Sequence, residues 1–245
     1  MIIRSHFVDL STPTGVMRTH VYEPVTTGRT FPGLLLYPEI FQQTAPIVRL
    51  CAQFASHGYV VMAPEIYHRH EPPGTVLGYD DTGKEKGNAY KKATPLSTFD
   101  EDAAVVLSAL REHPLCNGRL GTVGFCIGGH LAFRAALRPE IQACASFYPT
   151  DLHSGTLGEG GHANTLERVA EMKGELALLW GRQDPHIPAE GRAAIYRALL
   201  QAGTRFTWHE VNAEHAFMRD EGARYDAEAA RLAMTIALGL FHRAL

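Results

Sequence analysis

Apolar and polar residues follow one another in blocks along this chain, and the blocks predict strands and helices in regular succession. Short apolar runs of the kind found in buried strands occur at residues 31–37, 59–63, 120–125, 141–148, 176–180 and 205–211. Between them, apolar residues recur with helical spacing at residues 45–57, 98–113, 130–137, 189–201 and 223–245. Strands that alternate with helices predict an α/β fold with a mostly parallel sheet and helices on both faces.

Three segments interrupt this alternation. Residues 2–10 and 15–23 are predicted to form two strands joined by a turn, as a hairpin at the sheet edge. Residues 64–96 combine prolines, glycines and mixed charge, and residues 149–165 are rich in glycine and histidine. We expect both to be long connections, which in compact domains are commonly functional, and the sequence leaves open whether they close as a lid. Thr98 fits a capping box at the start of the next helix.

Composition and charge exclude several classes of protein. The chain has 245 residues, 20% charged and 45% hydrophobic, and shows neither a repeat nor a linker, so we expect one globular domain over residues 1–245. A net charge of −3 does not indicate a nucleic acid or an anionic membrane as partner. No apolar run approaches the roughly 20 residues that span a bilayer, and the N-terminus lacks the features of a signal peptide. We therefore expect a cytoplasmic protein, either a monomer or a small homo-oligomer.

The cysteines and histidines do not form a recognisable metal site. The four cysteines include no C-x-x-C pair, and the thirteen histidines include no H-E-x-x-H or comparable spacing, so neither a metal nor an organic cofactor is expected. Cys51 and Cys144 lie in apolar stretches and are interpreted as small core residues. Cys126 is different because of its surroundings.

The motif around Cys126 has the pattern of a nucleophile elbow. Residues 124–129 read Gly-Phe-Cys-Ile-Gly-Gly and connect the apolar run 120–125 to the helical pattern at 130–137. In such a strand–turn–helix the turn is so tight that the nucleophile takes strained backbone angles and its neighbours must be small. The nucleophile here is a cysteine where a serine is usual, and a thiol must lose its proton before it attacks.

Two later segments could activate this thiol. Asp184 follows the apolar run 176–180, and His215 follows the next predicted strand. Nucleophile, acid and histidine thus occur in the chain order of α/β-hydrolases, each beyond the carboxyl end of a strand, where parallel strands open on one edge. His215 would exchange protons with Cys126, and Asp184 would orient His215. The backbone N–H groups of Ile127 and Ile40 are expected to form the oxyanion hole.

Each of these features has a structural explanation when it is taken alone. The cysteine could be a buried residue in an ordinary turn, the aspartate a turn residue, and the histidine a structural side chain. Their joint occurrence, in this order and at these positions, favours catalysis.

Six motifs carry a resemblance that covers nearly all of the chain from Phe31 onward. They are YPEIF at 37–41, APEIYHR at 63–69, PGT at 73–75, GFCIGG at 124–129, GRQD at 181–184 and HAFMR at 215–219. With these motifs the chain resembles the dienelactone hydrolase family, the carboxymethylenebutenolidases, which have the α/β-hydrolase fold.

The resemblance implies roles for further residues. It implies a triad of Cys126, His215 and Asp184, with Glu39 beside it as an additional carboxylate toward which the resting, neutral thiol turns. It also implies that Arg69 and Arg219 bind the carboxylate of a lactone acid, a role that suits guanidinium groups. Each arginine could alternatively be a solvated charge or part of a structural ion pair.

The predicted function is therefore cysteine-dependent hydrolysis of a lactone or ester through a thioester acyl-enzyme. The favoured substrate is a small molecule that carries a carboxylate, as a dienelactone does. The same scaffold could instead act as an esterase, a thioesterase or a phosphotriesterase, or bind ligands without catalysis. A redox protein is also conceivable, although no resolving cysteine is close to Cys126 in sequence. Departures from the family pattern at residues 37–38, 79–92 and 150–165 leave the acyl and leaving-group preferences open.

Overall fold

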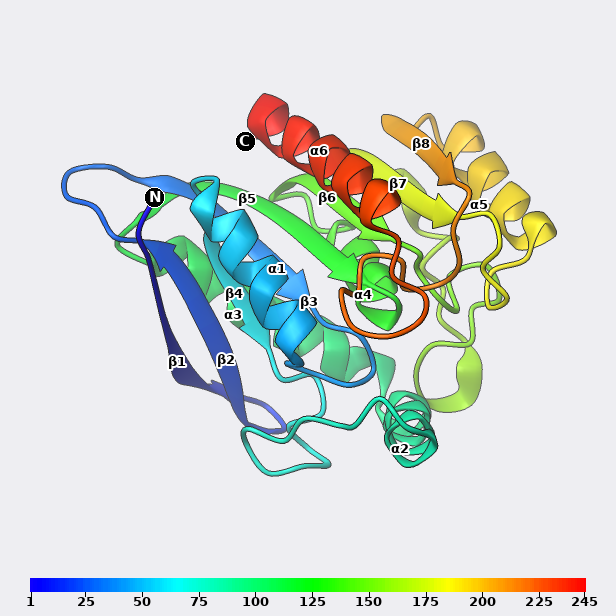
Figure 1. The fold of residues 1–245 in the computed structure, drawn as a ribbon, viewed down its shortest axis with the longest axis horizontal. Helices are drawn as coiled ribbons and strands as arrows, with labels where there is room; N and C mark the ends of the chain where they lie inside the picture. The colour runs from blue at the N-terminus through cyan, green and yellow to red at the C-terminus, as the bar shows by residue number, and fades with distance from the viewer.

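A single twisted sheet of eight strands forms the centre of the computed structural model, which describes all residues from Met1 to Leu245 (Figure 1). The spatial order of the strands is β1-β2-β4-β3-β5-β6-β7-β8. Their bounds are β1 Ile3–Thr12, β2 Gly15–Pro24, β3 Phe31–Tyr37, β4 Val60–Pro64, β5 Cys116–Phe125, β6 Ile141–Phe147, β7 Glu175–Gly181 and β8 Phe206–Val211.

The sheet has a parallel part and an antiparallel edge. The neighbours from β4 through β3, β5, β6 and β7 to β8 are all parallel. The β1–β2 hairpin is antiparallel and joins the sheet by pairing β2 with β4. The predictions of a mostly parallel sheet and of a hairpin at its edge are both confirmed.

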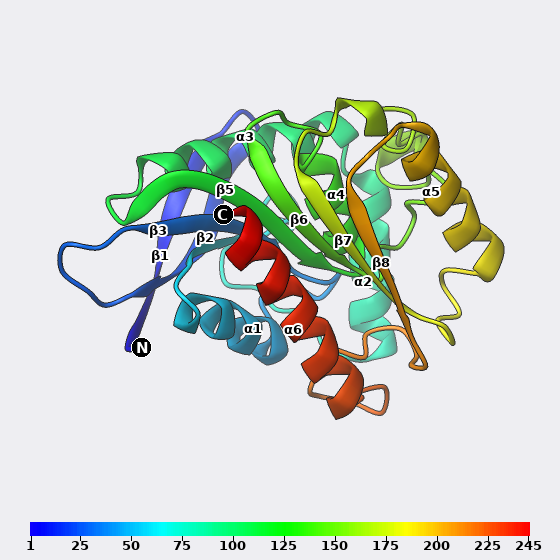
Figure 2. The ribbon, with the colours of Figure 1, turned by 90° about the horizontal axis from the view of Figure 1, so that it is seen from above.

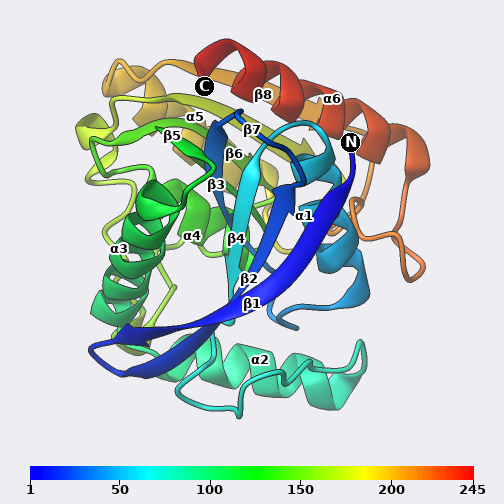
Figure 3. The same ribbon diagram turned by 90° about the vertical axis from the view of Figure 1, so that its left-hand side faces the viewer.

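Helices cover both faces of the sheet. Helices α1 (Ala45–Ser56) and α6 (Ala227–Ala244) lie on one face, and α3 (Leu96–Glu112), α4 (Ile127–Ala135) and α5 (Ala189–Gln201) lie on the other (Figure 2). A further helix, α2 (Asp81–Ala93), lies across one end of the strands (Figure 3). Two short 3₁₀ helices, Glu159–Gly161 and Val169–Glu171, occur in the loop between β6 and β7.

One continuous core of 70 buried residues holds these layers together. The central strands are buried on both faces, which explains their unbroken apolar sequences. On the α1/α6 face, Phe241 packs edge-on against Phe54 and Tyr59, with ring centroids 5.9 and 5.8 Å apart. Each fully buried aromatic side chain of this kind contributes about 1.5–3 kcal/mol of burial free energy. No helix of the chain combines the length and the apolar character needed to cross a membrane.

The expectation of an unstructured connection at residues 64–96 was wrong, because it contains α2. The residues that α2 buries are Gly83, Gly87 and Lys91. Their spacing of four residues is that of one helical face, but two of them have no side chain and the third is charged. Hydrophobic periodicity therefore could not detect this helix.

The starts of three other helices also differ from the expectation. Helix α3 begins at Leu96 after Pro95, and Thr98 is buried in its first turn without capping it. Helix α4 begins at Ile127, directly after the turn, and not at residue 130. Helix α6 begins at Ala227, where the side chain of Asp226 accepts a hydrogen bond from the N–H of Ala229 at 2.9 Å. Of these three starts, only that of α6 has a side-chain cap.

Helix α4 approaches β3 so closely that only glycine fits at residue 128. A Cβ atom on Gly128 would lie 2.3 Å from the carbonyl oxygen of Pro38 and 2.5 Å from that of Tyr37. These neighbours are backbone atoms, so they cannot rotate out of the way. The position of the helix relative to the strand depends on this missing side chain.

We expect Gly128→Ala to lower the free energy of unfolding by about 1–3 kcal/mol or more through overpacking. The matched control is Gly239→Ala in α6, where an added Cβ meets nothing within 4 Å. That change should raise stability by about 0.5–1 kcal/mol because alanine favours the helix. Urea denaturation of both variants measures the difference, and equal effects at the two positions would contradict the packing argument.

Candidate active site

Strained backbone conformations gather at the carboxyl ends of the parallel strands. The non-glycine residues with positive φ angles all follow strands β3, β5, β6 or β8, and they are Gln42, Cys126, Tyr148, Asp151 and Ala216. Such conformations cost roughly 1–3 kcal/mol each and persist only where the surrounding structure imposes them. Their concentration at one edge of the sheet marks this edge as the candidate site.

Cys126 forms the turn between β5 and α4. Its φ and ψ angles are 60° and −122°. Its backbone is held on both sides, since its N–H donates to the carbonyl of Phe147 at 3.1 Å and its carbonyl accepts from the N–H of Thr150 at 3.2 Å. The hydroxyl of Thr150 lies 3.9 Å from the Cys126 Sγ atom. The backbone that carries the thiol is thereby fixed at the sheet edge, and the side chain remains slightly exposed to solvent.

His215 and Asp184 form a short hydrogen-bonded pair next to this thiol. Nδ1 of His215 lies 2.6 Å from Oδ2 of Asp184, and both side chains are buried. The other Asp184 oxygen accepts a hydrogen bond from the backbone N–H of His186 at 2.8 Å. An aspartate held in this way keeps the proton of the imidazole on Nδ1, which leaves Nε2 for the thiol side.

The surroundings of His215 favour its protonated form. Burial alone would lower its pKa, but the negative charge of the Cys126 thiolate and hydrogen bonds with Asp184 and Cys126 outweigh burial and raise the pKa of His215 to about 10. The protonated imidazole is therefore stabilised at this site.

Glu39 lies in the same site and is paired with Arg219. The carboxylate is almost fully buried, and its Oε2 atom lies 3.5 Å from Nη1 of Arg219 without a hydrogen-bond partner. Burial raises the pKa of Glu39, although the charges of Arg219 and His215 act in the opposite direction. No hydrogen bond joins the Cys126 thiol to Glu39, and the side chain within hydrogen-bond distance of the thiol is that of Thr150.

Aromatic side chains hold Arg219 in place. Its guanidinium lies over the ring of Tyr79 at 4.4 Å from the centroid and is 5.8 Å from that of Phe41. The Tyr79 hydroxyl donates to the hydroxyl of Thr44 or accepts from it at 2.7 Å. Cation–π contact of this kind stabilises a partly desolvated guanidinium, so Arg219 stays at the cavity with its charge directed inward.

The two expected oxyanion-hole residues lie next to the thiol. Ile127 is the first residue of α4, so its N–H has no partner inside the helix. Ile40 follows β3, and its N–H donates to no backbone carbonyl. Helix α2 packs directly on this turn, because a Cβ on Gly87 would lie 2.5 Å from the carbonyl oxygen of Ile40. Ile40 lines the cavity and Ile127 directly follows Cys126, and their role as an oxyanion hole stays a prediction.

These groups surround a cavity of about 390 Å³. Helix α2 forms one wall with Lys84, Asn88 and Lys91. Four basic and four acidic side chains line the cavity in equal numbers, and they are Lys84, Lys91, Arg219, Arg224, Glu39, Asp80, Asp81 and Asp151. The cavity is therefore strongly polar without a net excess of Lys and Arg over Asp and Glu.

Arg69 lies outside this cavity. The preceding residue, His68, points inward and contacts Asp102 on α3 at 3.0 Å. Arg69 is consequently directed to the surface, where it is exposed and donates to the hydroxyl of Thr98 at 3.1 Å. The structure brings Cys126, His215, Asp184, Glu39 and Arg219 together but leaves Arg69 out.

The loop after β6 is tied to the site by a buried histidine. His130 on α4 contacts the carbonyl of Thr150 at 3.1 Å and the hydroxyl of Thr165 at 2.9 Å. Burial lowers the pKa of His130 to about 4, so it is neutral at physiological pH. This contact fixes both ends of the loop at 149–165 and places Thr150 and Asp151 at the cavity, a role that the sequence pattern did not indicate.

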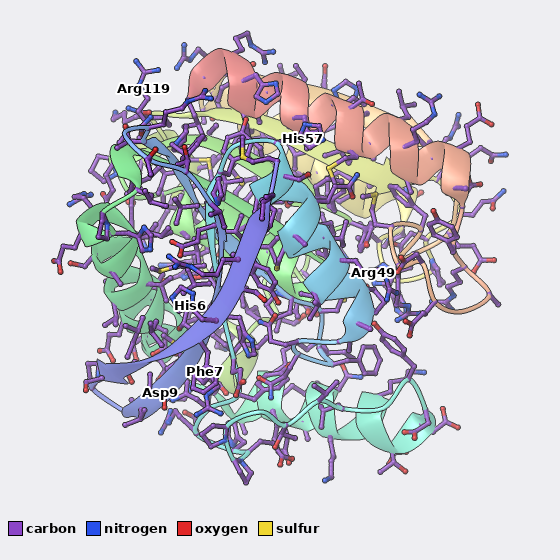
Figure 4. The ribbon with its side chains drawn as sticks, turned by 60° about the vertical axis from the view of Figure 1, so that its left-hand side comes forward. His6, Phe7, Asp9, Arg49, His57 and Arg119 are labelled. Carbon is purple, nitrogen blue, oxygen red and sulfur yellow. The ribbon has the colours of Figure 1, made fainter.

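A surface ion pair fixes the loop that carries Arg219. Arg49 projects from α1 toward the loop between β8 and α6 (Figure 4). Its guanidinium bonds both carboxylate oxygens of Asp220 at 2.6 Å and one of Glu221 at 2.8 Å. A two-pronged contact of this type is the geometry in which exposed ion pairs contribute most.

No group of three His, Cys, Asp or Glu side chains is arranged to hold a metal ion. The chemistry that the site offers is that of its own thiol, imidazole and carboxylates. A cysteine thiol, an imidazole and a carboxylate at one cavity suit attack on a carbonyl group followed by proton transfer.

Comparison with known proteins agrees with this geometry. The model of the dienelactone hydrolase family matches residues 17–245. A "Putative carboxymethylenebutenolidase" of Saccharomyces cerevisiae is 41% identical over 100% of this chain and 93% of its own length. The carboxymethylenebutenolidase of Pseudomonas putida is 30% identical over 82% of this chain and 81% of its own.

Solved structures show the same fold. A "Putative Dienelactone Hydrolase" from Klebsiella pneumoniae superposes with a TM-score of 0.85 at 24% identity and covers 99% of this chain and 100% of its own. The dienelactone hydrolase-like promiscuous phosphotriesterase P91 from metagenomic libraries has a TM-score of 0.79 at 17% identity. The match covers 100% of this chain and 99% of its own. At these identities the likeness concerns the fold.

The raised pKa of Glu39 predicts a pH-dependent effect of Glu39→Gln on stability. A carboxyl group with a raised folded-state pKa stabilises the protein below its unfolded value of 4.5 and loses that contribution as the pH rises. Glutamine does not titrate, so the free energy of unfolding of the variant should rise relative to that of the wild type as the pH increases above 4.5.

Chemical denaturation between pH 4 and 8 measures this difference. The control is Glu171→Gln, since its exposed pairing with Arg168 lowers the pKa of Glu171 and the trend should have the opposite sign. A difference in unfolding free energy between Glu39→Gln and the wild type that is constant or falls with pH would contradict the raised pKa of Glu39.

Proposed function

Because this chain belongs to the dienelactone hydrolase family, we propose that it is a cysteine-dependent hydrolase that opens a lactone or ester. The observation that carries the proposal is the hydrogen bond between Asp184 and His215 at the cavity where Cys126 sits in a strained strand–helix turn. The order of these residues along the chain and their burial are those of a catalytic triad. A protein that only binds ligands would not need this arrangement.

In the proposed reaction the Cys126 thiolate attacks the substrate carbonyl carbon. The N–H groups of Ile127 and Ile40 stabilise the resulting oxyanion. When the C–O bond breaks, the alkoxide or enolate takes the proton of the His215 imidazolium as it leaves, so that His215 becomes neutral and a thioester on Cys126 remains. Neutral His215 then removes a proton from water, and the hydroxide releases the acid and restores the thiolate.

Glu39 is proposed as a second proton acceptor whose basicity depends on the substrate. In the free site Arg219 partly offsets the effect of burial on Glu39. A substrate carboxylate that binds Arg219 would compete with Glu39 for the same guanidinium. Glu39 would then be a buried carboxylate with a weaker counter-charge, and its affinity for a proton would rise.

The proposed substrate is anionic, and Arg219 is the residue that supports this choice. It lies at the cavity, is stacked on Tyr79 and keeps its charge directed inward. Relatives of the chain are named carboxymethylenebutenolidases, and lactone acids are therefore the first substrates to test. Since Arg69 lies outside the cavity, a clamp made of these two arginines is not proposed. The cytoplasmic location and the oligomeric state remain predictions.

The first test is hydrolysis of a dienelactone carboxylate and of a neutral aryl ester. We expect wild-type turnover of the lactone acid, and a loss of roughly 10³-fold or more in kcat for Cys126→Ala. Cys126→Ser should also lose most activity, because a hydroxyl ionises far less readily than a thiol. Substantial turnover by either variant would exclude Cys126 as the nucleophile.

The role of Arg219 is tested by Arg219→Met with Arg69→Met as the matched control. Loss of a charged hydrogen bond to the substrate should raise KM for the lactone acid roughly 10- to 100-fold more than for the neutral ester. Arg69→Met should leave the ratio of the two KM values unchanged, because Arg69 lies at the surface on Thr98. Equal effects of the two variants would exclude Arg219 as the anion-binding residue.

A further inference from the structure

A second buried ion pair lies at the same cavity and is not used by the reaction described above. Nζ of Lys91 on α2 is 2.8 Å from Oδ2 of Asp151 in the loop after β6, and the two side chains are only 10% and 16% exposed. Both residues line the cavity that holds Cys126 and His215. A lysine buried at a cavity wall is uncommon, since lysines are almost never fully buried unless they are paired.

The structure holds Asp151 independently of Lys91. Asp151 has a φ angle of 61°, and its other carboxylate oxygen, Oδ1, accepts a hydrogen bond from the hydroxyl of Thr156 at 3.0 Å. Burial acts to raise the pKa of Asp151, but the charge and hydrogen bond of Lys91, with help from Thr156, lower it. Asp151 thus remains a charged carboxylate. Its hydrogen bond with Thr156 would hold it in place while Lys91 also binds another anion.

The two buried ion pairs flank the nucleophile. In the sheet β5 lies between β3 and β6, and the loops after these strands carry Glu39, Cys126 and Asp151 respectively. Arg219 is paired with Glu39 on the β3 side, and Lys91 is paired with Asp151 on the β6 side. The acyl substituent and the leaving group extend in different directions from the carbonyl carbon that Cys126 attacks, which allows one of them to face each cation.

We infer that Lys91 is a second anion-binding group, which receives a substrate carboxylate on the side of Cys126 opposite Arg219, with Asp151 as its partner in the free enzyme. The inference rests on the proposed ester hydrolysis and adds a substrate class to it, namely esters or lactones with a carboxylate on each side of the reacting carbonyl. Each carboxylate replaces the protein carboxylate that neutralises the cation in the empty site. This exchange keeps buried charge compensated throughout.

The competing explanation is that the pair only fastens α2 to the loop after β6. Two variants that break the same contact separate these explanations. Lys91→Met removes the cation, whereas Asp151→Asn removes its competitor and leaves the cation free. A fastening role predicts similar effects of both variants, while anion binding predicts opposite ones.

The kinetic test uses phenyl acetate, 4-carboxyphenyl acetate and monophenyl glutarate, which carry no carboxylate, one on the leaving group and one on the acyl group. For one of the two anionic esters, Lys91→Met should raise KM relative to phenyl acetate by roughly 10- to 100-fold, and Asp151→Asn should lower it. Arg219→Met should act mainly on the other anionic ester. Changes of equal size and sign for all three esters in both variants would overturn the inference.

A binding measurement makes the result independent of turnover. Calorimetry with glutarate and butyrate tests whether the protein prefers two carboxylates over one. We expect wild type to bind glutarate more tightly, Lys91→Met to abolish the preference and Asp151→Asn to increase it. If Lys91→Met does not fold, the double variant Lys91→Met/Asp151→Asn, which buries no uncompensated charge, should likewise show no preference. A preference that survives loss of Lys91 would overturn the inference, whereas a lack of Cys126-dependent hydrolysis with this binding pattern intact would overturn only the proposed function.

Discussion

The left-handed turn at Cys126 is the constraint on which the rest of the site depends. A cysteine at a φ angle of 60° is stable only because its neighbours allow the strand and the helix to approach without side chains between them. A Cβ on Gly124 would lie 1.9 Å from the carbonyl oxygen of Gly128, and one on Gly129 would lie 2.6 Å from that of Phe147. The close approach sets the thiol at the cavity that His215 also lines.

A second constraint is that the cavity contains its charges in compensated pairs. Glu39 is paired with Arg219, and Lys91 is paired with Asp151. Buried ion pairs contribute little net stability, because desolvation offsets most of their attraction. Their value at this site is that an incoming anion can exchange for a resident carboxylate without leaving a charge unpaired. Under the proposed function, selectivity for anions would come from competition between substrate and protein carboxylates, and not from a net positive cavity.

The sequence predicted most of the architecture, because the central strands and most helices follow simple hydrophobic rules. The predicted segments Phe31–Tyr37 and Ala189–Gln201 coincide with β3 and α5. A strand buried on both faces has a continuous apolar sequence, and a helix buried along one stripe has apolar residues at helical spacing. The positions of Cys126, Asp184 and His215 at strand ends could likewise be predicted, because a parallel sheet brings such ends together. Arg69 could not be placed in this way, since whether a loop side chain points inward depends on its neighbour His68, whose contact with Asp102 is a tertiary one.

Helix α2 shows why function itself can obscure structure in a sequence. Its inner face is Gly83, Gly87 and Lys91, and each departs from the apolar stripe that identifies an amphipathic helix. Gly87 is required because the helix rests on the carbonyl of Ile40, and Lys91 because it faces Asp151 across the cavity. A helix that packed on this cavity with leucines would be easy to recognise from its periodicity, but it would fill the space and present no charge. The residues that make α2 difficult to predict are therefore those through which it contributes to the site.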